Sequence, residues 1–191
     1  MHSPGILILS APSGAGKTSL SQALVKARGD AGLTVSHTTR PRRPGETDGR
    51  DYHFVDHDRF VQMVRDGLFV EYAEVFGNFY GTSLATIRSL ADAGKHALLE
   101  IDWQGARKVR QKYPGARSVF IMPPSRDILE QRLRDRGQDS DTVIEKRMRE
   151  ADSEMSHRHE YDRVIVNDDF ERALGDLNDM LEGLGHPGRD T

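Results

Sequence analysis

The sequence predicts an α/β fold, a P-loop doubly wound parallel sheet with a small strand-rich insert and a helical lid, and three observations support it. Short apolar runs that suit buried strands alternate with amphipathic helical stretches, which is typical of a parallel sheet. The first apolar run, Ile6 to Leu9, leads through a glycine-rich stretch into a helical pattern from Thr18, the context of a P-loop. Arginine-rich segments at residues 40–50 and 126–149 interrupt the alternation.

Composition limits the classes of protein to consider. The chain has 191 residues, 36% hydrophobic and 30% charged, which suits one compact domain, and no apolar run is long enough to span a bilayer. The net charge of −3 provides no overall basic field for nucleic acid or an anionic membrane. Because cysteine and a signal-peptide pattern are absent, we expect a cytoplasmic protein. His157 and His159 lack a third metal ligand at a familiar spacing, and we interpret them as surface or lid residues.

Residues 10–18 carry the P-loop pattern, with the sequence Ser-Ala-Pro-Ser-Gly-Ala-Gly-Lys-Thr. Gly16, Lys17 and Thr18 match G-x-x-x-x-G-K-[ST], while Ala11 occupies the place of the first glycine. Such a turn lets backbone N–H groups converge on phosphate oxygens in front of a helix N-terminus. Lys17 would then reach the β and γ phosphates and Thr18 would bind Mg²⁺. The structural alternative is an ordinary turn with a solvated lysine.

The stretch after the first helix has a different character. A short strand is predicted over residues 33–36. Eleven residues then contain two prolines, two glycines and four arginines, namely Arg40, Arg42, Arg43 and Arg50. The prolines and glycines predict an irregular loop, in which bidentate guanidinium groups suit a phosphate. A solvated charged surface is an equal alternative.

Residues 36–82 are expected to form the strand-rich insert. Glycine and asparagine at 77–78 predict a hairpin turn between two of its strands. Asp56 or Asp58 is expected to cap a helix that ends at Gly67, and Ser83 to cap the helix that follows. The predicted strands cover residues 52–55, 68–76 and 79–82.

The second half of the chain returns to alternating strands and helices. Glu100 and Asp102 end the predicted strand 96–102, and acids at such a strand end orient Mg²⁺ or substrate in P-loop enzymes. The other elements expected are a helix over 106–113, strands over 118–122 and 164–167, and a terminal helix from Phe170.

Two arginine-bearing helices precede the last strand. Ser125 is expected to cap the first, on which Arg132 and Arg136 project from one face, and the second carries Arg147. Such a helical hairpin is a candidate lid over transferring phosphates. Spacing alone favours a solvated charged surface.

Several separate motifs, in order, resemble those of the guanylate kinase family. Besides residues 10–18, they are Ser-His-Thr-Thr-Arg-Pro-Arg-Arg-Pro-Gly-Glu at 36–46, Gly-Asn-Phe-Tyr-Gly-Thr-Ser at 77–83, Glu-Ile-Asp-Trp-Gln-Gly at 100–105, Arg-Gly-Gln-Asp-Ser at 136–140 and Ile-Val-Asn-Asp-Asp at 165–169. The likeness runs from Ile6 to Leu184. The family is similar in accepting alanine at the position of Ala11. This sequence departs from the family pattern at Glu100, where many members carry aspartate.

The resemblance implies an ATP-dependent guanylate kinase, which transfers the γ-phosphoryl group of ATP to GMP with Mg²⁺ as cofactor, in guanine nucleotide biosynthesis and recycling. It implies a single domain over residues 1–184. The parts of that domain are a core over 1–35, 83–124 and 158–184, a GMP-binding subdomain over 36–82 and a lid over 125–157, followed by a tail over 185–191.

The resemblance also implies a role for particular residues. Catalytic roles fall to Lys17, Arg132, Arg136 and Arg147. ATP binding falls to Ala11, Pro12, Ser13, Gly14, Ala15, Gly16, Lys17, Thr18 and Asn167. GMP binding falls to Ser36, Arg40, Arg43, Tyr52, Glu71, Tyr80, Thr82 and Asp102. The metal is assigned to Thr18, with Glu100 as a further candidate.

The chemistry of guanine makes the base contacts reasonable. Guanine presents N1–H and N2–H₂ donors beside its O6 acceptor, so Glu71 can accept two hydrogen bonds while the Ser36 hydroxyl donates to O6. Adenine would set its N1 lone pair against the same carboxylate. Mispaired polar groups of this kind give discrimination of roughly 10⁴ or more.

Three alternatives stay open. The acceptor could be another nucleoside monophosphate or a phosphorylated sugar, although Ser36, Glu71 and Asp102 favour guanine. A catalytically inert guanylate-kinase-like module that binds a protein is a second alternative, and a nucleic-acid binder, which the acidic net charge disfavours, is a third. We expect ATP and GMP as the partners, with no nucleic acid and no membrane, and leave self-association open.

Overall fold

The computed structural model describes residues 5–75, 77–135, 137 and 140–184. Its core is a five-stranded sheet of order β2-β7-β1-β8-β9, in which every neighbouring pair is parallel. The strands are β1 (Ile6–Ser10), β2 (Ala31–Leu33), β7 (His96–Glu100), β8 (Arg117–Met122) and β9 (Arg163–Val166).

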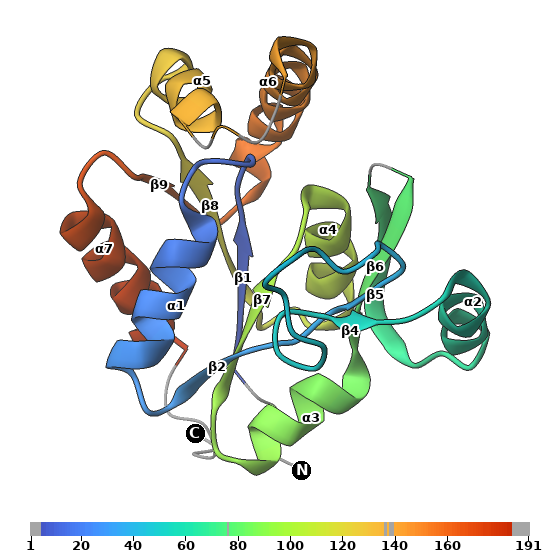
Figure 1. Cartoon of the computed structure of the whole chain (residues 1–191). Coiled ribbons are helices and arrows are strands. Elements are labelled where there is room, and N and C mark those ends of the chain that lie inside the picture. The colour runs from blue at the N-terminus through green and yellow to red at the C-terminus, as the bar shows by residue number, and fades with distance from the viewer. Residues whose placement is uncertain (1–4, 76, 136, 138–139, 185–191) are drawn as a thin grey trace.

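Helices cover both faces of this sheet (Figure 1). On one face lie α1 (Lys17–Ala27) and α7 (Phe170–Glu182), and on the other α3 (Leu84–Asp92) and α4 (Trp103–Lys112). Successive side chains of β1 point to opposite faces of the sheet. Leu7 and Leu9 pack with α1 and α7, while Ile6 and Ile8 pack with α3 and α4. The predicted doubly wound sheet is confirmed.

The insert forms a second sheet beside the core (Figure 1), of order β4-β3-β6-β5. The predicted hairpin is present as an antiparallel pair of β5 and β6. Phe60 of α2 stacks on Phe69 and Phe79 with ring centroids 4.7 and 5.4 Å apart. Val70 shares a buried cluster with Val109 of α4, which docks the second sheet on the core. The elements are β3 (His37–Thr38), β4 (His53–Phe54), α2 (His57–Arg65), β5 (Phe69–Val75) and β6 (Asn78–Ser83).

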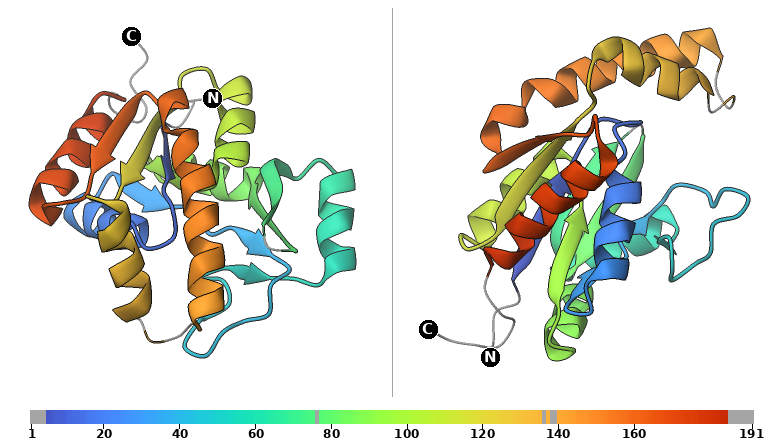
Figure 2. Two further views of the ribbon diagram at one scale, coloured as in Figure 1. Left: turned by 90° about the horizontal axis from the view of Figure 1, so that it is seen from above. Right: turned by 90° about the vertical axis from the view of Figure 1, so that its left-hand side faces the viewer.

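Two helices, α5 (Arg126–Asp135) and α6 (Asp141–Ser156), lie above the end of the sheet that carries the P-loop (Figures 1 and 2). They bury Leu129 and Met148 against each other in a small core of their own. After α6 comes the 3₁₀ turn η1 (Arg158–Glu160). His157, at the end of α6, stacks on Trp103 of α4 with ring centroids 3.9 Å apart and planes inclined by 14°.

Two local predictions were wrong. The strand predicted at 33–36 lies earlier, at Ala31–Leu33, because its ladder partner is the stretch of β7 that begins at His96. The helix predicted from residue 106 begins at Trp103, because the Asp102 carboxylate caps it by accepting a hydrogen bond from the backbone N–H of Gly105 at 2.8 Å.

Two predictions fall outside the described residues, namely the role of Arg136 and the tail at 185–191. Within the described part of the chain, no helix is both long enough and apolar enough to cross a membrane.

Candidate active site

The P-loop connects β1 to α1 at the end of the sheet that faces α5 and α6 (Figure 1). Gly14 and Gly16 have φ angles of 98° and 94°, in the left-handed region that favours glycine. The N–H of Ala15 donates to the carbonyl of Pro12 at 3.1 Å and closes the turn. Ala11, by contrast, packs its methyl group against the core, so a side chain is accommodated there. The first N–H groups of a helix have no partner within the helix, so the start of α1 beside this turn is suited to bind an anion.

Two elements from the second half of the chain hold this loop. Asn167, which is 7% exposed and follows β9, donates from Nδ2 to the carbonyl of Ala15 at 2.8 Å. A Cβ atom on Gly16 would lie 2.3 Å from the same nitrogen, so this approach requires glycine. Leu129 of α5 lies over Gly14. Asn167 thus braces the loop itself, and its expected contact with adenine stays a prediction.

Hydroxyl and carboxylate oxygens gather beside the loop. Thr18 is exposed in the first turn of α1, and Glu100 ends β7, the neighbour of β1. The Oγ of Ser21 lies 2.5 Å from Oε1 of Glu100 and 3.0 Å from the carbonyl of Thr18. Oxygen donors of this kind fit Mg²⁺, which usually takes one or two protein ligands beside the nucleotide phosphates.

The helical pair α5 and α6 brings charged side chains toward the loop. Arg132 of α5 donates from Nη2 to the carbonyl of Asn167 at 3.3 Å. On α6, burial raises the pKa of Glu154 to about 7, while the nearby ammonium group of Lys17 opposes that rise. Arg147 lies on the same helix.

Glu71, on β5, is a buried carboxylate at the junction of the second sheet with α4. It is 5% exposed, and its Oε1 accepts a hydrogen bond from the backbone N–H of Thr82 at 2.9 Å. Burial raises the pKa of Glu71 to about 7, with the neighbouring carboxylate of Asp102 adding to the rise. The hydroxyls of Ser36 and Thr82 are 3.3 Å apart. These four side chains form one polar cluster.

A second cluster of predicted residues lies on the same small sheet, where Tyr80 stands two residues before Thr82 along β6. Arg40 donates from Nη2 to Glu46 at 2.7 Å, and its guanidinium group lies 5.5 Å from the ring centroid of Tyr52. Tyr52 meets Tyr80 edge to face with centroids 5.9 Å apart. The backbone N–H of Arg43 donates to the other oxygen of Glu46 at 2.8 Å. Glu46 therefore holds the arginine loop in place through two of its arginines. From composition alone, this loop could be either a phosphate-binding site or a solvated charged surface.

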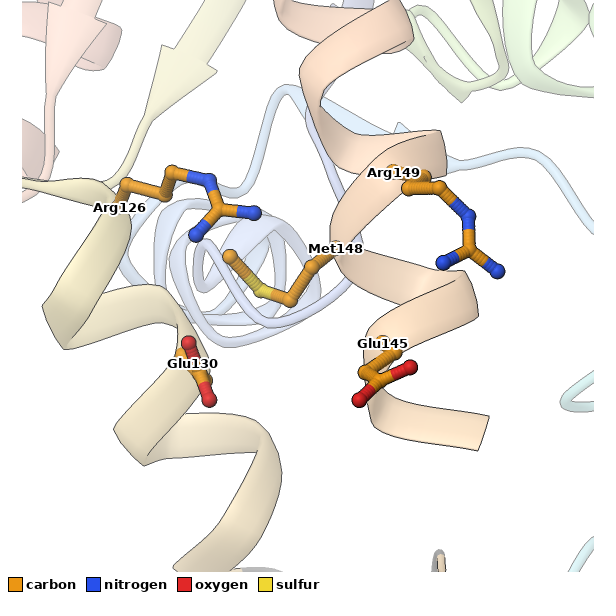
Figure 3. A pocket seen from close by; sticks show the side chains of 5 residues that line it. All are labelled: Arg126, Glu130, Glu145, Met148 and Arg149. Atoms are coloured by element: carbon orange, nitrogen blue, oxygen red, sulfur yellow. The ribbon is translucent and has the colours of Figure 1, made fainter. Parts of the chain in front are cut away.

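A hollow of about 230 Å³ lies between α5 and α6 (Figure 3). The formal charges of two arginines and two glutamates around the hollow cancel. No residue predicted to bind a substrate is among its lining residues. Its lining residues are Arg126, Glu130, Glu145, Met148 and Arg149.

Comparison with known proteins decides the family. The guanylate kinase family profile matches residues 3–184. The chain belongs to the guanylate kinase family. A guanylate kinase of Alkalilimnicola ehrlichii is 59% identical over 184 residues, covering 96% of this chain and 91% of that protein. A guanylate kinase of Escherichia coli K12 is 56% identical over 178 residues, covering 92% and 86%. The crystal structure of guanylate kinase from Anaplasma phagocytophilum matches with a TM-score of 0.76 at 37% identity, covering 96% and 87%.

For a guanylate kinase, the structure groups the predicted residues into three sets. The P-loop set holds Lys17 and Thr18, with Ser21 linking Thr18 to Glu100. The base set holds Ser36, Glu71, Thr82 and Asp102, and the phosphate set holds Arg40, Arg43, Tyr52 and Tyr80. Their roles in binding stay predictions.

Sequence reasoning missed several neighbours of these sets. Ser21 stands three residues after Thr18, so helical spacing could have placed it near Glu100. Glu46 is the last residue of the motif quoted for residues 36–46, but it was not recognised as the ion-pair partner of Arg40, six residues before it. For Glu154 no local signal existed, because the fold alone carries α6 to the P-loop.

Proposed function

We propose that this chain transfers the γ-phosphoryl group of ATP to GMP, giving ADP and GDP. The observation that carries the proposal is the buried carboxylate of Glu71, grouped with the hydroxyls of Ser36 and Thr82 on a sheet separate from the P-loop. A P-loop by itself does not select an acceptor. A buried acid beside hydroxyl groups matches the donor and acceptor edge of guanine, and the curated relatives named above are guanylate kinases.

In the proposed reaction, an oxygen of the GMP phosphate attacks the γ-phosphorus of ATP, and the bond to the β–γ bridging oxygen breaks. No protein residue becomes covalently modified. Lys17 and the N–H groups of the P-loop hold the triphosphate, while Arg40, Arg43 and the lid arginines neutralise charge that spreads over the transferring group. When bound, Mg²⁺ would neutralise charge on the ATP phosphates, with Thr18 as a ligand and Glu100 nearby.

In this proposal the base is read by Glu71 and Ser36. The carboxylate accepts from N1–H and N2–H₂ of guanine, and these donors favour its ionised form although burial disfavours it. Adenine offers a lone pair at N1, so AMP would leave the buried carboxylate without its partners.

The test is ADP production with ATP, Mg²⁺ and each of GMP, AMP, CMP and UMP in turn. We expect turnover with GMP to exceed the others by about 10⁴-fold in kcat/KM. Lys17→Ala serves as the control for contaminating kinases. Turnover confined to AMP, or none with any acceptor, would contradict the proposal, and the second outcome would favour an inert binding module.

The cytoplasmic location, the absence of a nucleic-acid or membrane partner, and the division into a core, a GMP-binding subdomain at 36–82 and a lid at 125–157 are also proposals. The division is supported by the separate second sheet and by the small core that α5 and α6 share.

A further inference from the structure

We propose that Gly105 is a positioning residue for guanine selectivity, because the missing side chain at this helical position makes the space in which the Glu71 carboxylate sits. The inference rests on the proposed contact of Glu71 with the guanine base. Gly105 touches no substrate in this proposal, and it acts through Glu71.

The geometry is specific. Gly105 is buried in the first turn of α4, and a Cβ atom built on it would lie 2.6 Å from Oε2 and 3.1 Å from Cδ of Glu71. The same atom would lie 3.3 Å from Cβ of Ile101. Distances below 3 Å between such atoms are not tolerated, so one of the two groups must move.

The group that moves is the carboxylate. It ends a flexible side chain, whereas the backbone of α4 is fixed by the Asp102 cap and by the packing of Val109 in the core. Because Oε1 already accepts from the N–H of Thr82, turning the carboxylate away from α4 changes that hydrogen bond and the direction in which both oxygens point. A methyl group at position 105 would therefore alter recognition more than folding.

Helix propensity makes glycine a poor choice at this position without such a reason. Glycine inside a helix is less favourable than alanine, because it loses more backbone freedom on folding. Gly175 offers the matched comparison, since it lies in α7, is exposed, and has no neighbouring atom within 4 Å of the place that a Cβ atom would take. The two glycines share the helical backbone and differ in what their missing side chains would meet.

A second contact of α4 holds the same stretch of β5. The ammonium group of Lys108, one turn after Gly105, donates to the carbonyl of Tyr72 and lies 4.4 Å from the centroid of its ring. Tyr72 directly follows Glu71 in β5. Lys108 of α4 and Asp102, the N-cap of α4, are the charged groups that act on the Glu71 carboxylate. One face of α4 thus fixes the backbone of β5 and leaves a space for its carboxylate.

The experiment compares Gly105→Ala with Gly175→Ala using GMP and IMP as acceptors. IMP has the N1–H and O6 of guanine but no 2-amino group, so a correctly placed carboxylate binds GMP with one more hydrogen bond. Loss of hydrogen bonds to a charged group corresponds to about 10- to 100-fold in affinity. We expect Gly105→Ala to lower kcat/KM for GMP by this factor, to lower the ratio of GMP to IMP by about tenfold, and to leave the dissociation constant of ATP unchanged. Gly175→Ala should match the wild type in all three of these quantities.

A double-mutant cycle separates positioning from packing. If Gly105 acts through Glu71, then Gly105→Ala has no further effect on kcat/KM for GMP in a Glu71→Ala background. The double variant also contains no carboxylate to clash, so it is expected to fold wherever Glu71→Ala folds, even if Gly105→Ala alone does not, as thermal unfolding would show. Additive losses, an unfolded double variant, or an unchanged ratio of GMP to IMP in the folded single variant would each overturn the proposal. A Glu71→Ala variant with normal GMP turnover would instead refute the proposed role of Glu71 in the base site.

Discussion

Replacing Glu71 by glutamine should stabilise the folded protein at high pH while it removes activity toward GMP. The reason is the burial that raises the pKa of this carboxyl from 4.5 to about 7. Between those two values the folded protein holds a proton that the unfolded chain has released. Raising the pH through this range therefore favours unfolding, and the stability present below pH 4.5 is lost as the pH approaches and passes 7.

The magnitude follows from the two pKa values. Each tenfold change in an acid constant corresponds to about 1.4 kcal/mol, so the ionised carboxylate costs the fold roughly 3 kcal/mol at pH 8. At pH 5 most of this cost is absent, because the folded protein keeps its proton. The glutamine amide has the same shape, no titration, and an oxygen that can still accept from the N–H of Thr82.

The measurement is urea unfolding of the ligand-free wild type and of Glu71→Gln at pH 5 and pH 8, followed by the fluorescence of Trp103, the single tryptophan of the chain. The free energy of unfolding of the variant minus that of the wild type should increase by about 2–3 kcal/mol from pH 5 to pH 8. Comparing the two proteins isolates Glu71, because burial also raises the pKa of Glu154 to about 7 in both. A difference that stays constant with pH, or that grows in favour of the wild type, would refute the reasoning.

Three further predictions concern the P-loop and its supports. Lys17→Ala should lower kcat by about 10²–10³ while the unfolding midpoint is kept, because it removes a cation from the transferring group, and near-normal turnover would contradict this role. Asn167→Ala removes the hydrogen bond to Ala15 beside Gly16 and should raise KM for ATP about tenfold without changing KM for GMP; an equal change in both would indicate general unfolding instead. Leu129→Ala deletes a fully buried side chain of α5 and should cost about 2–5 kcal/mol in urea unfolding, whereas a loss below about 1 kcal/mol would contradict its place in that core.

How well the sequence predicted the fold depended on how local each signal was. The strand, P-loop and first helix follow from consecutive residues, and the hairpin around Gly77 follows from its turn residues. The start of α4 was misplaced because the capping role of Asp102 was overlooked in a residue already considered as a ligand. The strand β2 was misplaced because its position is chosen by pairing with β7, about sixty residues further along.

For the candidate site too, the sequence predicted the features that depend on neighbouring residues and missed those that depend on distant ones. Residues 10–18 showed from their order alone that a phosphate loop was present, and the quoted motifs identified the family that the comparisons confirmed. The partnership of Arg40 with Glu46, the approach of Glu154 to Lys17 and the brace from Asn167 to Ala15 required the folded chain. None of these pairs has a helical or strand spacing that could predict it.

The sequence by itself determined the P-loop, the alternation of strands and helices and the family, because these depend on residue types at short, fixed separations. Only the tertiary structure decided that Glu71 is buried, that its pKa is raised, and that Gly105, thirty-four positions away in the chain, leaves the space for its carboxylate. The physical reason is that burial and close packing are properties of the groups that surround a side chain, and in this protein those groups come from β5, β6 and α4, which the chain brings together only when it folds.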